Sequence, residues 1–409
     1  CIRDRDKGSI MNNVKRLMGW AYRNSDVFYY FSFLSLVFAK SLGFYSGNTE
    51  YRIIMVFSML CLGIKLVLTK YTVKEIVVMA AIALYAVFIY LKTGYITFTI
   101  TVVTLLGAKN IDVYDLMKKV LFVRLICMTV LISASTAGIV GNFVKDQYDD
   151  GLTYSFGFQN PNDFMVNVFV NVALIFYLNY KKLNVLYFLL SAYAFYAVYC
   201  VTKSMTGMML GVFLLVVFLF LKIFDRLGNV GNKIKQIISA AVVPTSLWCF
   251  IGTFIVSAVF DVNNRFMFTL DQLVSGRLKI QHQYWLNYGF SLLGKDISRG
   301  AARWDGVQIN NGFLDSNYWC SFYKYGFVSV MIFIVFLVAA SWYFHKKKDY
   351  NVVIIINTLC IYGLMEDFLI SSIVNPFLLL AVYAVYSMLK ERKGSVKEKK
   401  VENACCNNN

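Results

Sequence analysis

Twelve apolar runs, most of them long enough to cross a bilayer as a helix, constrain the fold of this 409-residue chain more than any other feature. A transmembrane helix needs about 20 predominantly apolar residues. In lipid, only helices and closed barrels satisfy every backbone polar group, and the sequence lacks the short alternating segments of a barrel. We therefore expect an all-α integral membrane protein with about twelve transmembrane helices, forming one polytopic domain over residues 1–389. The runs lie near 27–45, 52–69, 75–91, 94–108, 119–140, 162–180, 183–201, 204–224, 236–260, 319–343, 351–369 and 372–389.

The composition excludes an ordinary soluble protein. Charged residues make up 15% of the chain and hydrophobic residues 58%, whereas soluble domains carry about 25% charged residues. The formal net charge of +17 would suggest a nucleic-acid partner for a soluble protein, but most of the surplus lies in short loops and tails between the apolar runs. This distribution is typical of membrane proteins, so we expect membrane lipids, and no nucleic acid, as partners.

The basic residues also predict the orientation. With the amino terminus inside, the cytoplasmic segments hold 26 of the 40 lysines and arginines, and the external loops hold 10. Because basic residues accumulate on the cytoplasmic side, we expect a multi-pass protein of the cell membrane with both termini in the cytoplasm. The chain starts at Cys1, Met11 is a candidate initiator, and the first run is expected to remain as an anchor. Residues 390–409 are charged and are expected to form a disordered cytoplasmic tail.

One large external loop, 261–311, departs from this charge pattern because it holds six of the ten external basic residues. Orientation does not explain them, so the loop is either a solvated basic face or the binding surface for an anionic ligand. Residues 269–290 are expected to form a helix at the interface, with Arg277, Gln281, Tyr284 and Tyr288 on one side. The planar guanidinium of Arg277 suits the paired oxygens of a phosphate. His282 falls about 140° away and is expected to be structural, unless the helix breaks.

Asp315 lies directly before the next apolar run. A carboxylate at the outer mouth of a helix bundle can act as a general base for a hydroxyl nucleophile. The alternative is a carboxylate that caps the following helix and complements its dipole. Ionisable residues at membrane depth usually mark a site or pair with each other, and five are further candidates: Arg124, Lys203, Lys324, Glu366 and Asp367.

The sequence gives no sign of a metal, a disulfide or a cofactor. The nine cysteines form no CxxC pair, and several lie within apolar runs, where they act as small hydrophobes. His282 and His345 are too few for a histidine-rich metal centre.

Four short motifs carry a resemblance to a known family. They are FGFQNPND at 156–163, TKSMTG at 202–207, VSGRL at 274–278 and DSNYWCSFYKYG at 315–326. In order, spacing and topology the chain resembles, over about 150–390, the O-antigen and capsular polysaccharide polymerases (Wzy type), which are related to the O-antigen ligases. Two departures stand out: Ser204 and Met205 occupy the place of the family's Ser-Arg, with Lys203 as a substitute charge. Asp315 stands where the ligases have histidine, which favours a polymerase.

The resemblance implies a GT-C-like, metal-independent membrane glycosyltransferase. Its substrates would be oligosaccharide repeats carried by undecaprenyl pyrophosphate, joined at the outer face of the membrane. It implies catalytic roles for Asp315 and Arg277. The residues expected to bind substrate are Arg265, Arg299, Arg303, Lys203, Asn160, Asn162, Asn317 and Tyr318.

A chain-length regulator and a flippase of the same pathway are the expected protein partners. The alternatives are an O-antigen-ligase-type enzyme and a flippase or other transporter. The long outer loop and the lack of an obvious repeat relating the two halves weigh against the transporter.

Overall fold

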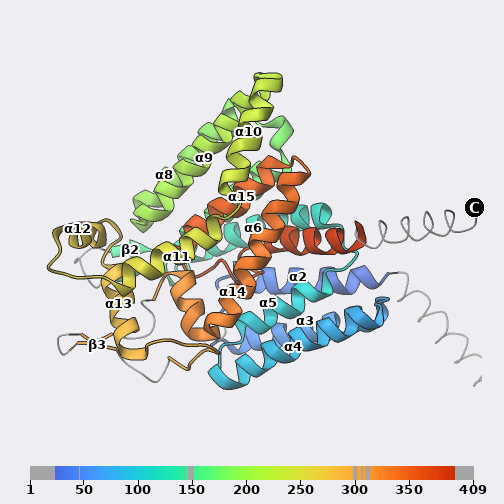
Figure 1. The fold of residues 1–409 in the computed structure, drawn as a ribbon, viewed down its shortest axis with the longest axis horizontal. Coiled ribbons are helices and arrows are strands. Elements are labelled where there is room, and N and C mark those ends of the chain that lie inside the picture. The colour runs from blue at the N-terminus through green and yellow to red at the C-terminus, as the bar shows by residue number, and fades with distance from the viewer. Residues whose placement is uncertain are drawn as a thin grey trace, which may run out of the picture.

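The structure, a computed structural model, describes residues 24–45, 47–141, 143–145, 152–297, 302–304, 307–309 and 314–391. Within these ranges the chain is almost entirely helical (Figure 1). Each of the twelve predicted apolar runs contains a helix, which confirms the all-α class. The expected initiator Met11 and the tail beyond residue 391 lie outside the described residues.

The first helices are α2 (Ser25–Ser41), α3 (Thr49–Leu68), α4 (Val73–Thr93), α5 (Thr97–Gly107), α6 (Val113–Thr136) and α7 (Pro161–Leu178), followed by the 3₁₀ turn η1 (Tyr180–Lys182). Next come α8 (Val185–Thr202), α9 (Met205–Arg226), α10 (Gly228–Val242), α11 (Thr245–Ala258), α12 (Arg265–Leu273) and α13 (Arg277–Tyr288). The chain continues with α14 (Asn317–Lys346), α15 (Tyr350–Tyr362) and a helix over 378–391. Two antiparallel pairs of three-residue strands complete the described part: β1 (Phe143–Lys145) with β2 (Leu152–Tyr154), and β3 (Ala302–Trp304) with β4 (Val307–Ile309).

Six described helices are long and apolar enough to cross a membrane: α3, α4, α7, α8, α9 and α14. A seventh crossing results if α10 and α11, which meet at an angle of 41° beside Pro244, form one bent span. Helices α5 and α15 are apolar but shorter. The protein is therefore an all-helical chain compatible with several passes through a membrane.

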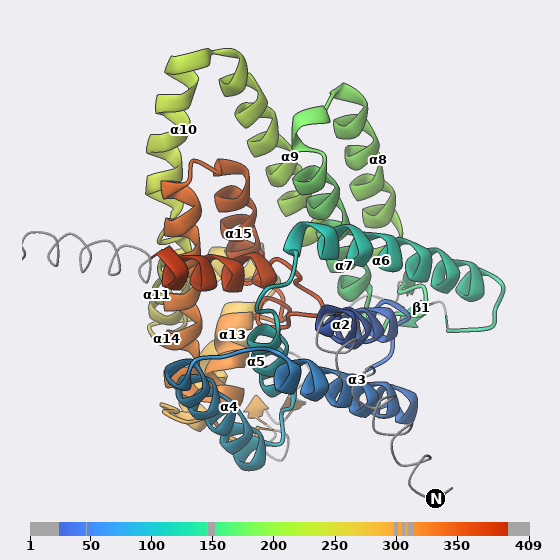
Figure 2. The ribbon, with the colours of Figure 1, turned by 90° about the vertical axis from the view of Figure 1, so that its right-hand side faces the viewer.

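The helices divide into an inner and an outer set. Within its most apolar window, α7 is 61% buried, whereas α4 and α8 are each 17% buried. Exposed Leu, Ile and Val side chains on the outer helices, such as Leu91 and Val185, suit contact with lipid. Figures 1 and 2 show α8, α9 and α10 as one group, α2 to α5 as another, and α14 and α15 between them.

Helix α14 is broken at Gly326, and the break fixes the end of the large loop. Gly326 has φ 88° and ψ 162°, and a Cβ there would lie 2.5 Å from the carbonyl oxygen of Leu292. Only glycine fits such a close approach at positive φ. The loop backbone replaces the helical hydrogen bonds, because Lys295 N donates to Tyr323 O at 2.7 Å and Phe327 N donates to Ser291 O at 2.8 Å. The loop is thereby held against the segment that follows Asp315.

The expected single helix over 269–290 is wrong. Residues 274–276 separate α12 from α13, because Ser275 (φ 58°) and Gly276 (φ 76°) both adopt left-handed backbone conformations. These conformations end a right-handed helix. The predicted face of the second half is correct, since Arg277, Gln281 and Tyr284 are all buried.

Candidate active site

Arg277 is the first residue of α13, and the left-handed turn before it aims its side chain into the bundle. Gly276 precedes it with open space where a Cβ would stand. One turn further on, Gln281 Oε1 accepts hydrogen bonds from Ser257 Oγ at 2.6 Å and Thr253 Oγ1 at 3.3 Å. Both donors belong to α11, so these bonds lock the rotation of α13 and with it the position of Arg277.

The guanidinium of Arg277 joins three parts of the chain. Its Nε and Nη2 atoms each donate to Asp315 Oδ2 at 3.2 Å, and Nη2 also donates to Glu366 Oε1 at 3.0 Å. Its Nη1 atom lies 3.5 Å from the Thr206 hydroxyl, near the start of α9. We call Arg277, Asp315 and Glu366 the arginine cluster.

Asp315 does not cap α14. The capping residue is Ser316, which makes no side-chain capping bond, and the Asp315 carboxylate turns toward Arg277 instead. The side chain of Asp315 is 30% exposed, whereas that of Glu366 is 11% exposed. Asp315 is therefore the carboxylate of the cluster that an incoming molecule can reach.

Glu366 lies in the segment 363–377, which leaves α15 without continuing as a helix. Asn317 holds this segment, because its backbone N donates to Gly363 O at 2.9 Å and its Oδ1 accepts from Ile370 N at 3.2 Å. Tyr318 donates its hydroxyl to Cys360 O at 3.0 Å. Asn317 and Tyr318 are each 1% exposed and position the segment that carries Glu366, and their expected contact with substrate stays a prediction.

The pKa values of both carboxyl groups in the cluster, which lie outside the helices that can span a membrane, are raised. Burial raises the pKa of Glu366 to about 8; Arg277 opposes this shift, and the carboxyls of Asp315 and Asp163 add to it. Burial also raises the pKa of Asp315, again against Arg277. At neutral pH Glu366 therefore holds a proton most of the time, which lowers the negative charge around the guanidinium.

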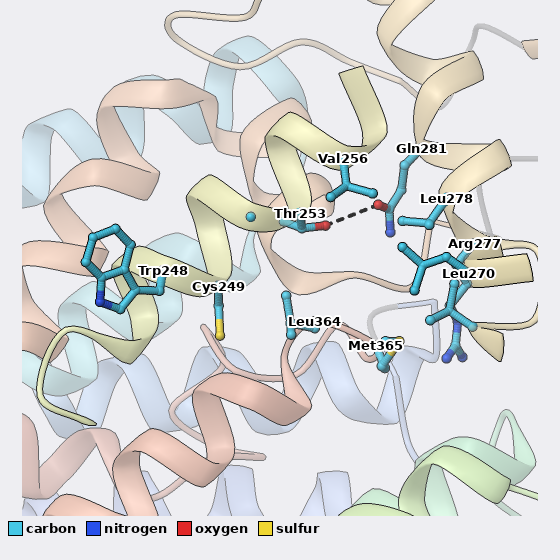
Figure 3. A pocket seen from close by; sticks show the side chains of 12 residues that line it. Trp248, Cys249, Thr253, Val256, Leu270, Arg277, Leu278, Gln281, Leu364 and Met365 are labelled. Atoms are coloured by element: carbon cyan, nitrogen blue, oxygen red, sulfur yellow. Dashed lines mark hydrogen bonds between the residues drawn. The ribbon is translucent and has the colours of Figure 1, made fainter. Parts of the chain in front are cut away.

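An apolar cavity of about 360 Å³ adjoins the cluster (Figure 3). Its walls come from α11, α12 and α13 and from Leu364 and Met365, and most of the side chains that line it are apolar. Figure 3 shows Trp248 and Arg277 at opposite ends of the set of residues that line the cavity. Its size falls in the range of small-molecule sites.

Half-buried Lys324 and buried Arg124 have partners of their own. Lys324 Nζ pairs with Asp367 at 3.0 Å, and Cys320 Sγ lies 2.8 Å from the same carboxylate oxygen. Arg124 donates to Asn171 Oδ1 at 2.7 Å and to Asn167 Oδ1 at 2.9 Å, both on α7. The Arg124 contacts join α6 to α7, and the Lys324 contact joins α14 to the segment 363–377, so both charges pair within the protein.

Three other residues considered in the sequence analysis, Asn160, Lys203 and His282, lie at different places in the structure. Asn160 caps α7, its Oδ1 accepting from Asn162 N at 2.8 Å. Lys203 is exposed with φ 56° and precedes Thr206 by three residues. His282 has the structural role expected of it, since its Nδ1 lies 2.8 Å from Ser257 O.

The three other loop arginines expected to bind substrate make no contact with the arginine cluster within the described part of the chain. Arg265 begins α12 with an exposed side chain and makes no ion pair with any described residue. Arg299 lies outside the described residues, as does the side chain of Arg303 on β3. Across the described ranges, no group of three or more His, Cys, Asp or Glu residues could hold a metal ion.

Sequence reasoning did not anticipate Thr206 and Asp163 as neighbours of Arg277 and Glu366. Both lie within the quoted motifs TKSMTG and FGFQNPND, and this is the signal that could have drawn attention to them. Comparisons with protein families, with curated proteins and with solved structures found no match to this chain.

Proposed function

We propose that the protein is a membrane glycosyltransferase that joins oligosaccharide repeats, each carried on undecaprenyl pyrophosphate, into a polysaccharide at the outer face of the cytoplasmic membrane. The observation that carries this proposal is the arginine cluster at the end of an apolar cavity. A lipid pyrophosphate has the matching parts, since its phosphates need a fixed cation and its lipid needs an apolar surface.

In the proposed reaction a hydroxyl oxygen of the acceptor repeat attacks the anomeric carbon of the donor chain. A bond forms between that oxygen and the carbon, while the bond from the carbon to the pyrophosphate oxygen breaks. The hydroxyl proton passes to Asp315, and lipid pyrophosphate leaves with the bonding electrons. Arg277 stabilises the negative charge that develops on this leaving group, which is usually the largest single contribution to catalysis.

The contacts within the cluster fit these roles. Arg277 lies 3.2 Å from Asp315, so one guanidinium positions both the leaving group and the base. Asp315 is accessible and faces a fixed positive charge, which favours its ionised form. A protonated Glu366 reduces the repulsion that an arriving pyrophosphate would meet.

The proposal includes twelve crossings in a GT-C-like arrangement, supported by the twelve apolar runs that each contain a helix. It also includes an outer location for the cluster. Helices α12 and α13 and strands β2 and β3 belong to loops with a predicted external position, and Figure 1 draws all four at the same side of the molecule.

The test compares purified wild-type protein with Asp315→Asn on lipid-linked repeats. Asparagine still accepts a hydrogen bond from Arg277 but cannot take up a proton, so the rate of polymerisation should fall by about 10² to 10⁴. Asp261→Asn, an exposed carboxylate of the same loop, is the matched control and should retain the wild-type rate. Near-normal turnover by Asp315→Asn would remove Asp315 as the base.

A further inference from the structure

A second, larger hollow of about 1040 Å³ lies at the other end of the bundle. The beginning of α6, the end of α7, η1, the end of α9, α10 and the turn between α14 and α15 all contribute to it. Five lysines line it: Lys118, Lys181, Lys182, Lys235 and Lys348. We call this region the lysine hollow.

Among the described residues, an acid pairs with just one of these lysines. Lys235 Nζ pairs with Asp225 Oδ1 at 2.6 Å, and Tyr180 donates its hydroxyl to the other oxygen of Asp225 at 2.8 Å. The other four, Lys118, Lys181, Lys182 and Lys348, are exposed and make no ion pair with any carboxylate of the described chain.

The wall of the hollow holds a second acid besides Asp225. Asp349 lies in the turn between α14 and α15, and burial raises the pKa of its carboxyl. Five lysines against two aspartates leave the lining of the hollow with a net positive charge even when both acids are ionised.

One wall of the lysine hollow is apolar. Leu121, Phe122 and Leu125 follow Lys118 along α6, and the Phe122 side chain is 66% exposed. Residues three and four apart lie on one helical face, so this apolar strip continues directly from the basic entrance at Lys118. A ligand that fits both parts has an anionic head and an apolar chain.

The lysine hollow and the arginine cluster lie about one membrane thickness apart. Helix α7 runs from Pro161, next to Asp163, to Leu178 in the wall of the hollow, and α9 runs from Met205, next to Thr206, to Asp225 and Arg226. At 1.5 Å per residue these helices are about 27 and 33 Å long, and a bilayer core is about 30 Å thick. The loops that meet at the hollow are those that the charge count assigned to the cytoplasm.

We infer that the lysine hollow binds the phosphate headgroup of an anionic phospholipid of the cytoplasmic leaflet, with an acyl chain lying along Leu121, Phe122 and Leu125 of α6. Basic pockets between transmembrane helices on the cytoplasmic side hold such headgroups in other membrane proteins. The site does not depend on the proposed polymerase activity.

The experiment uses the full chain purified in detergent and freed of bound lipid. Phosphatidylglycerol is added to the wild type and to the triple variant Lys181→Gln/Lys182→Gln/Lys348→Gln, and retention is measured by native mass spectrometry. Each lysine near a headgroup contributes about fivefold to affinity, so the triple variant should bind about a hundredfold more weakly. Lys233→Gln/Lys346→Gln removes two exposed lysines, one on α10 and one at the end of α14, that do not line the hollow. This control should bind as the wild type does.

Two further probes identify the part of the ligand that is recognised. Phosphatidylcholine should bind much more weakly than phosphatidylglycerol, and soluble tripolyphosphate should not displace the bound lipid. Equal retention of phosphatidylglycerol by the triple variant would overturn the inference. If phosphatidylcholine were retained as well as phosphatidylglycerol, the site would be an apolar surface without headgroup recognition. If tripolyphosphate displaced the lipid, the site would bind soluble phosphates. Either outcome contradicts a site for an anionic phospholipid.

Discussion

The two ends of the helix bundle use their basic residues in opposite ways. At the arginine cluster, one buried guanidinium contacts two carboxyl groups and a threonine hydroxyl. In the lysine hollow, four exposed lysines face a large cavity without a carboxylate partner among the described residues.

The difference follows from the dielectric surroundings of each charge. A buried cation needs counter-charges because the protein interior screens poorly, whereas an exposed lysine is stabilised by water. Arg277 is consequently held in a fixed geometry, which its proposed role in stabilising a transition state requires. The lysines keep their charge available for a mobile, loosely defined partner such as a lipid headgroup.

The contrast between the arginine cluster and the lysine hollow requires that the two lie on opposite sides of the membrane. Asn263 is exposed in the large loop, and Asn232 is exposed on α10 near the hollow. In a variant with all nine native cysteines replaced, an impermeant thiol reagent added to intact cells should label Asn263→Cys. It should label Asn232→Cys only after the cells are opened. Labelling of Asn232→Cys alone in intact cells would reverse the orientation.

The largest graded effect is expected at Arg277. Arg277→Ala removes the cation opposite the leaving group, so turnover should fall by about 10² to 10³ or more. Arg277→Lys keeps the charge without the planar fork, so its turnover should fall less. Asp261→Asn, an exposed carboxylate of the same loop outside the cluster, is again the control. Full polymer length with Arg277→Ala at normal protein levels would exclude Arg277 from the site.

A smaller effect, the dependence of donor affinity on pH, is expected from Glu366. Its pKa of about 8 means that the proton is lost as pH rises through that value, and the new carboxylate then repels the pyrophosphate donor. Affinity for the donor should therefore fall above about pH 8 in the wild type but not in Glu366→Gln. If donor affinity varied with pH in the same way in the wild type and in Glu366→Gln, Glu366 would have no part in binding the donor.

The same shift in pKa affects folding. Between about pH 4.5, the ordinary value for a glutamate, and about pH 8, the folded protein holds a proton that the unfolded chain releases. The contribution of Glu366 to the free energy of unfolding is thus largest at the acidic end of this range and is lost as pH rises through it. Glu366→Gln should flatten that part of the stability profile.

Much of the fold could be predicted from the sequence, because apolar runs of this length leave the backbone few alternatives. Local geometry explains the errors. The predicted helix over 269–290 overlooked the left-handed Ser275–Gly276 turn, although a glycine beside a serine signals a break. The run 236–260 bends beside Pro244, which is visible in the sequence as well.

The candidate site was only partly predictable, because its contacts join residues far apart in the chain. The motifs pointed to Arg277 and Asp315, and the structure brings these two within 3.2 Å. The sequence indicates Glu366 only as one of several ionisable residues at membrane depth, since nothing local points to a partner 89 residues away. Burial of Asn317 and Tyr318 was not anticipated, because a motif does not tell whether a polar side chain faces a ligand or holds its own backbone.

The most direct test of the proposed polymerase is a product balance. Purified protein is incubated with lipid-linked repeat units, and both the polymer and the released undecaprenyl pyrophosphate are measured. We predict growing chains and one lipid pyrophosphate released per glycosidic bond formed, with both products lost in Arg277→Ala. Intact repeat units that cross a vesicle bilayer without any new glycosidic bond would contradict a polymerase and identify a transporter.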